Sequence, residues 1–127
     1  MAEMSNYLEN ALINGTLRAT TYTAPATVYV SLHSADPGDG GGNEISGGSY
    51  ARKAVTFGAP SNGVSTNSAD VTFDQATGSW GTITHIGIQD ALTSGNLLYH
   101  TPLTTSKTID TDDVFRIVSG QLSVTLA

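Results

Sequence analysis

The chain has 127 residues, of which 39% are hydrophobic and only 13% are charged, and eleven acidic residues against five basic ones give a formal net charge of −6. This length fits one domain with a sizeable core, so residues 1–127 are expected to form a single domain. Duplex nucleic acid and anionic membranes are bound through clustered Lys and Arg, so this acidic balance argues against both as direct partners. The absence of Cys excludes disulfides and thiolate metal sites.

The first residues, MAEMSNYLENALI, are acidic and lack the basic start and apolar core of a signal peptide. No stretch of the sequence approaches the ~20 apolar residues of a membrane-spanning helix. We therefore expect the protein to be made in the cytoplasm and not to be exported by this route.

One helix is predicted near the N-terminus, over residues 5–18. Asn6 is expected to cap it, with Glu9 three residues later in a capping-box-like pair, and Gly15 is expected to end it. A helix of this length is unstable alone, so it must dock on its own sheet or on another subunit. The apolar side chains on one side of it are Tyr7, Leu8, Ala11 and Leu12. Of these, Tyr7, Leu8 and Leu12 are expected to be buried in the domain or in an interface.

Beyond this helix the apolar pattern changes to a period of two. In TVYVSLH (27–33), Val28, Val30 and Leu32 point to one face and the residues between them to the other. Further runs of this kind, bounded by turn-forming residues, are 51–57, 69–74, 82–90, 96–101, 114–120 and 121–127. The pattern predicts an all-β fold, an antiparallel β-sandwich or barrel of about seven to eight short strands with one short N-terminal helix. The expected core residues are Val28, Val30, Leu32, Trp80, Ile86 and Ile88.

The segment 36–49 is the one long irregular stretch, and it is rich in Gly. Asp36, Asp39 and Glu44 could supply oxygen ligands to calcium, but their spacing does not meet the EF-hand pattern. Two acids three residues apart with Pro37 between them are typical of a turn. The glycines lead into a strand and not a helix, which disfavours a phosphate site. We expect a structural loop without a cofactor, in which these three acids are candidate metal ligands only.

No catalytic set of side chains can be assembled from the sequence. His33, His85 and His100 fall on predicted strands without H-x-H or H-E-x-x-H spacing, so they are expected at half-exposed strand positions. A G-x-S-x-G motif is absent, and most of the acids fall in loops. The chain is therefore expected not to be an enzyme.

Two residues allow two interpretations. Trp80 is expected to anchor the core, and the alternative is an exposed aromatic contact for a carbohydrate or a partner subunit. Arg52 is either solvated or a buried or interfacial guanidinium that binds carboxylates of the glycine-rich loop, such as Glu44. Together with Tyr50, Arg52 is a candidate interface residue.

Four segments that cover most of the chain are 5–18, 23–39, 44–60 and 80–117. Their most specific motifs are L-x-x-A-D-P, E-x-x-G-G-x-Y-A-R and W-G-T-I-T-H-x-G-I. Read in this order, the segments resemble a family of small virion proteins of tailed bacteriophages, whose members are variously labelled head fibre, tail fibre or minor structural or decoration protein.

The resemblance implies a non-enzymatic structural protein of the virion, assembled in the host cytoplasm. The chain is short and has neither repeats nor heptads, which favours a capsid decoration or cement protein that binds the outer head shell. Its partners would be the major capsid protein or other virion proteins, with a homotrimer as the expected oligomer. The alternative is a tail or tail-fibre component, such as a glycan-binding adsorption module. The helix 5–18 is the expected docking element, and the loop 36–49 is a second candidate for it.

Overall fold

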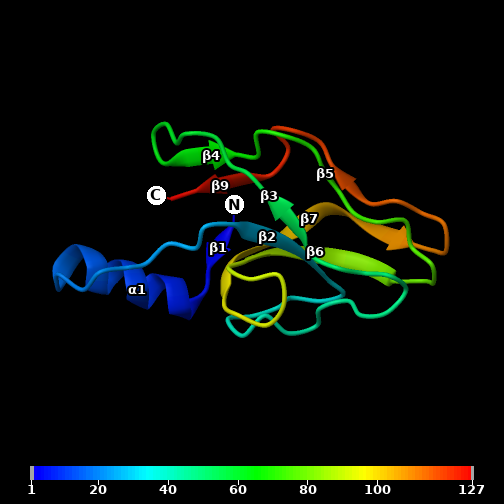
Figure 1. Ribbon diagram of the computed structural model, residues 1–127, viewed down its shortest axis with the longest axis horizontal. Helices are drawn as coiled ribbons and strands as arrows, with labels where there is room; N and C mark the ends of the chain where they lie inside the picture. Colours follow the sequence, from blue (N-terminus) through cyan, green and yellow to red (C-terminus); the bar gives the residue numbers. More distant parts are fainter. Residues whose placement is uncertain (1, 127) are drawn as a thin grey trace.

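A five-stranded antiparallel sheet forms the main layer of the computed structural model, which describes residues 2–126 (Figure 1). The order of its strands is β1-β7-β6-β2-β3. Strand β1 spans Glu3–Met4, β2 Val28–His33, β3 Lys53–Val55, β6 Gly81–Gln89 and β7 Leu97–Ile109. Helix α1 spans Asn6–Leu17, directly after β1.

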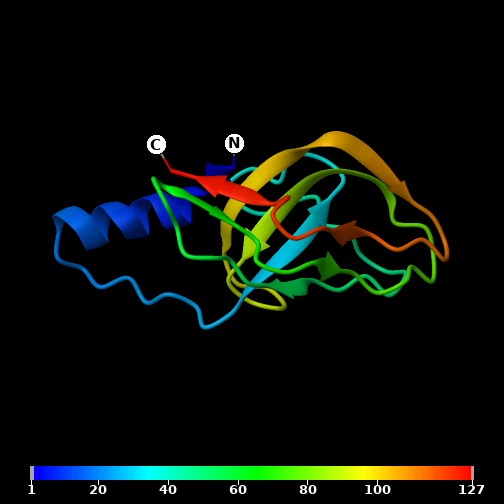
Figure 2. The ribbon, with the colours of Figure 1, turned by 90° about the horizontal axis from the view of Figure 1, so that it is seen from above.

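Two small antiparallel sheets complete a sandwich-like arrangement (Figure 2). One pairs β4 (Val64–Thr66) with β9 (Ser123–Thr125), and the other pairs β5 (Val71–Thr72) with β8 (Arg116–Ile117). The all-β fold with one short N-terminal helix is confirmed. Strands β1 and β4 were not predicted, because β1 directly precedes the helix and β4 begins within the turn-forming stretch 59–65, so neither lies in a longer alternating run.

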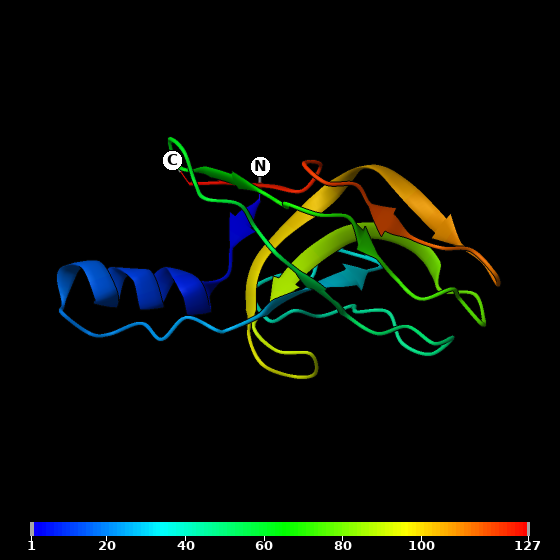
Figure 3. The same ribbon diagram turned by 45° about the horizontal axis from the view of Figure 1, so that its top comes forward.

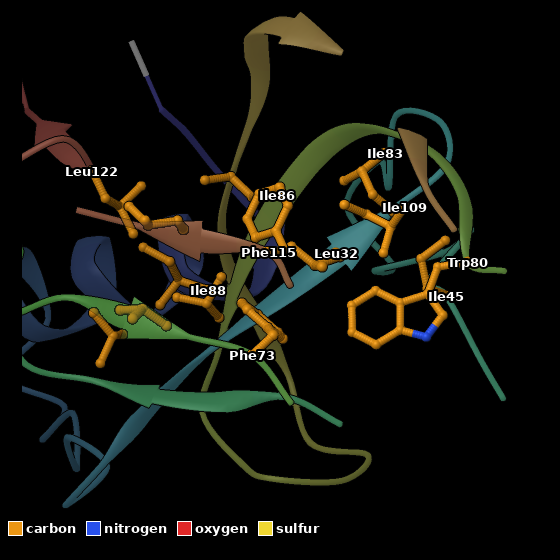
Figure 4. Close-up of a cluster of buried hydrophobic side chains, with 14 of the residues drawn as sticks. Leu32, Ile45, Phe73, Trp80, Ile83, Ile86, Ile88, Ile109, Phe115 and Leu122 are labelled. Carbon is orange, nitrogen blue, oxygen red and sulfur yellow. The ribbon is translucent and has the colours of Figure 1, made fainter. Parts of the chain in front are cut away.

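The core lies between the main sheet and the segments of the small sheets (Figure 4). Val30 and Leu32 of β2 are fully buried, and the core also contains Phe73 and Phe115. Trp80 is 5% exposed, and its ring meets that of Tyr50 edge-on at 5.5 Å between centroids. The other buried members of this core are Ile45, Val55, Val71, Ala76, Ile83, Ile86, Ile88, Ile109, Ile117 and Leu122. Val28 is only partly buried and packs against the edge of this cluster.

A bulge in the pairing of β6 with β7 changes which residues of β6 face the core. Ile83 pairs with Lys107 and His85 pairs with Pro102. A step of two residues along β6 therefore corresponds to a step of five residues along β7. The bulge shifts the alternation by one residue, and Ile83 lies in the same core cluster as Ile86. The regular alternation expected for this strand is therefore wrong between Ile83 and His85.

The second face of strand β2 is also buried, which the sequence did not predict. Ser31 and His33, expected on an outward face, are both fully buried beneath the segment that follows β2. Their side chains are joined at 2.8 Å, and His33 Nδ1 lies 2.8 Å from the carbonyl oxygen of Gly42. Since a carbonyl only accepts, Nδ1 is protonated and Nε2 accepts from the Ser31 hydroxyl. Gln89 donates to Ser31 Oγ and completes this polar chain.

Helix α1 projects from the β-domain at one end of the long axis, and the chain returns beside it to β2 (Figures 1 and 3). Within residues 2–126 no helix is long and apolar enough to cross a membrane.

Candidate functional site: helix α1 and the glycine-rich loop

The first turn of α1 is anchored on strand β7. Ser5, not Asn6 as predicted, is the N-cap, and its Oγ accepts from the backbone N–H of Leu8 at 3.3 Å. The same hydroxyl donates to the carbonyl oxygen of Leu97, and the Ser5 N–H donates to Leu98 O at 2.9 Å. Leu8 is 3% exposed. This end of the helix is therefore fixed by both hydrogen bonds and apolar burial.

Beyond its first turn the helix is largely exposed. Tyr7 is 43%, Ile13 54% and Leu17 78% exposed, whereas Leu12 is half-buried. The helix also continues past Gly15, where the sequence predicted its end. It stops at Leu17 because Ala19 adopts a left-handed backbone with φ of 55°.

Ile13 and Leu17 were not selected from the sequence, although their spacing of four residues places them on one side of a helix. The predicted apolar side contains Leu8 and Leu12, and these two side chains do face the protein. The exposed pair lies outside that stripe. Such exposed apolar side chains on a projecting helix are typical of a contact surface.

The glycine-rich loop is tied to the start of α1. The Asp39 carboxylate accepts from the backbone N–H of Asn6 at 3.1 Å and from its side-chain amide at 2.8 Å. A carboxylate at this position also interacts favourably with the positive end of the helix dipole. Asp36 accepts from the backbone N–H of Gly38 at 2.9 Å, which closes a turn of the kind predicted for this segment.

Glu44, Tyr50 and Arg52 form one hydrogen-bonded cluster. The Glu44 carboxylate accepts from Arg52 Nε and Nη2, both at 2.9 Å, and from the Tyr50 hydroxyl at 2.7 Å. Arg52 Nη1 also donates to the carbonyl oxygens of Ala91 and Ser94, both at 2.8 Å. The guanidinium thus holds Glu44, as one of the two interpretations of Arg52 proposed. The cluster joins the glycine-rich loop, the segment before β3 and the turn between β6 and β7.

The cluster shifts the protonation equilibria of its members. Burial raises the pKa of Glu44, but the hydrogen bonds from Arg52 and Tyr50 outweigh burial and leave it below its ordinary value of 4.5. The bond to Glu44 raises the pKa of Arg52. Burial, followed by the bond to Glu44, raises the pKa of Tyr50. The cluster is therefore an ion pair with a neutral phenol at neutral pH.

A pocket of about 520 Å³ beside the helix start is lined by acidic side chains and His100. His100 is 6% exposed, which corrects the prediction of a half-exposed position. Its Nδ1 lies 3.6 Å from Asp36 Oδ1 and its Nε2 lies 3.8 Å from Glu3 Oε2. Between residues 2 and 126 no three His, Asp or Glu side chains are grouped so as to hold a metal ion. Asp36 and Asp39 both line this pocket, whereas Glu44 does not and is bonded to Arg52 and Tyr50 instead.

The sequence of the chain matches the model of one known protein family. The family model described as "Podophage GP4 fiber I protein gp80" matches residues 3–125, nearly the entire chain. No curated protein matches the chain. The match covers the projecting helix, the glycine-rich loop and the β-sandwich together. The chain thus belongs to the family of the podophage GP4 fibre I protein gp80, and it is a structural protein of the bacteriophage virion.

Proposed function

We propose that this chain is a non-catalytic fibre subunit that is attached to a neighbouring virion protein through helix α1. The observation that carries the proposal is the exposure of Ile13 and Leu17 on a helix whose first turn is anchored on strand β7. Burying one such side chain contributes about 1.5–3 kcal/mol. A specific contact buries roughly 800 Å² on each partner, and many copies on one particle add avidity.

The polar residues support a structural role without catalysis. Glu44 is neutralised by Arg52, Asp39 binds the start of α1, and His33 is fully buried in a hydrogen-bonded chain. Each of these groups is held by partners within the protein. None is thereby left to act as an acid, a base or a nucleophile on a substrate.

We place the subunit on the outer head shell, where it acts as a decoration or cement protein. The 127 residues contain neither the internal repeats nor the heptads that build a long shaft, which favours a role in bridging capsid subunits. The partner would be the major capsid protein, and a trimer would match a three-fold site of the shell.

A place on the tail is the second candidate, because the family's description names a fibre protein. The subunit would then be a tail or tail-fibre component, such as a glycan-binding adsorption module. Gold-labelled antibody on intact particles, viewed by electron microscopy, separates these two sites. Label on the head supports the first placement, and label on the tail refutes it.

The attachment role of α1 is tested with the double variant Ile13→Asp/Leu17→Asp. Because both side chains are exposed, the β-domain should keep its thermal unfolding midpoint, while incorporation into particles should fall at least about tenfold. Leu8 is unsuitable for this test because it is buried in the anchored turn. Leu92, 51% exposed in the turn after β6, provides the matched control Leu92→Asp. Normal incorporation of the helix variant would refute the attachment role.

A further inference from the structure

A groove of about 670 Å³ lies between the second half of β7 and the segment that follows it. Its lining includes the core residues Ile86 and Phe115. At its rim Val114 is 52% and Val118 46% exposed, and Leu103 is half-buried. The groove therefore offers apolar surface that an apolar side chain from another molecule could cover.

The groove also carries unpaired positive charge in an acidic protein. Lys107 and Arg116 line it, and neither has an ionic partner among residues 2–126. Asp113 is the acidic residue of the lining, and its carboxylate accepts from the backbone N–H of Asp110. Two basic side chains and one acidic side chain give the lining a formal charge of +1, whereas the chain carries −6. An acidic and apolar partner fits this groove.

The exposed stripe of α1 has that composition. Glu9, Ile13 and Leu17 are four residues apart and lie on one side of the helix. Glu9 is exposed and has no ionic partner within the described part of the chain. The stripe thus presents one carboxylate followed by two apolar side chains.

We propose that the α1 stripe of one copy binds in the groove of a second copy. This inference rests on the proposed attachment role of α1, and it assigns α1 to a second copy of this chain, so that contact with the major capsid protein would be made by other surfaces. The carboxylate of Glu9 would lie against Lys107 or Arg116, and Ile13 and Leu17 would cover Val114 and Val118.

The contact joins two different surfaces of the molecule. Helix α1 lies at one end of the long axis, and the end of β7 with the segment after it lies at the other (Figure 1). A contact between unlike surfaces is heterologous, so it links copies head to tail and either closes into a ring or continues as a filament. The same contact would be repeated between every pair of neighbours.

The first experiment measures the mass of the purified chain by light scattering between about 1 and 200 μM. The unmodified protein should form oligomers. Leu17→Asp on the helix and Val118→Asp on the groove should each weaken assembly at least about tenfold, while Leu92→Asp should not change it. A monomer at all concentrations would overturn the proposal. If Leu17→Asp weakens oligomer formation but Val118→Asp does not, the proposal is also overturned, because the helices would then pair with each other.

The second experiment exchanges the charges. Glu9→Lys should weaken assembly by about tenfold. Lys107→Glu and Arg116→Glu should also weaken it, and the larger effect identifies the residue that contacts Glu9. Combining Glu9→Lys with one of the two groove variants should restore assembly, and each double variant keeps the net charge of −6. Failure of both combinations to restore it would refute the pairing.

Failure of this inference is distinguishable from failure of the proposed function. If the purified chain is monomeric but Ile13→Asp/Leu17→Asp still prevents incorporation into particles, α1 docks on a different virion protein. If neither assembly nor incorporation depends on α1, both proposals are wrong.

Discussion

Gly87 shows how one residue position can be restricted by the side chains around it. A Cβ atom at Gly87 would lie 2.8 Å from Leu97 Cδ1, 2.8 Å from Ser31 Oγ and 3.0 Å from His33 Nε2. These distances are shorter than real Cβ contacts, and two of the three atoms belong to the buried polar chain. The glycine is thus needed for packing and not for its backbone conformation.

We predict that Gly87→Ala lowers the free energy of unfolding by about 2 kcal/mol, because an extra methyl group in a filled interior forces its neighbours apart. Chemical denaturation of both proteins measures the change. Gly40→Ala is the matched control, since nothing lies within 4 Å of a Cβ there. An equal decrease in the free energy of unfolding for Gly87→Ala and Gly40→Ala would contradict the packing explanation.

At the scale of elements, α1 depends on a contact that is distant in sequence. Its N-cap residue, Ser5, is fully buried, and the Ser5 hydroxyl is bonded to the carbonyl oxygen of Leu97, 92 residues away. The helix is too short to be stable by itself. Its formation is therefore coupled to the pairing of β1 with β7, which brings Ser5 to that carbonyl.

We predict that Ser5→Ala destabilises α1 by about 1–2 kcal/mol, because it removes the N-cap hydroxyl together with its hydrogen bond to the Leu97 carbonyl oxygen. Hydrogen exchange of the α1 amides should accelerate about tenfold, while β6 amides should change less. Thr16→Ala removes a hydroxyl that is bonded within the helix, to Leu12 O, and should have little effect. Unchanged exchange in Ser5→Ala would show that the cap does not hold the helix.

At the scale of the whole molecule, two clusters link distant segments and titrate in different pH ranges. Burial is the main cause that lowers the pKa of His33 below 6.5, so protonation of the unfolded chain reduces stability as the pH falls below that value. The Glu44 pKa is below 4.5, so its contribution is present above pH 4.5 and is lost as the pH falls through the folded-state pKa.

We predict that Glu44→Gln lowers the unfolding midpoint at pH 7, because the Arg52 guanidinium loses its partner, at a cost of about 2–4 kcal/mol. Below pH 4.5 the variant should lose less further stability than the unmodified protein. Thermal unfolding between pH 3 and 8 tests both expectations. A parallel decline of the two proteins below pH 4.5 would show that Glu44 does not cause the loss.

Some of the fold was predictable because it depends on local patterns. The alternation of Val30 and Leu32 predicted a strand with these two side chains in the core, and the spacing of Leu8 and Leu12 predicted a helix near the N-terminus. The family resemblance rested on motifs that lie in the loop before β3 and in β6. The ion pair of Arg52 with Glu44 was one of two interpretations of Arg52. The hydrogen bonds from Arg52 to the carbonyl oxygens of Ala91 and Ser94 were not predicted.

The sequence by itself thus determined the fold class, because the period of apolar residues reports directly on secondary structure. The tertiary structure alone decided that Ser5 caps α1, that His33 is buried beneath the glycine-rich loop, and that Ile13 and Leu17 project into solvent. Each of these depends on which distant segment covers a side chain. Neither a local period nor a short motif contains that information.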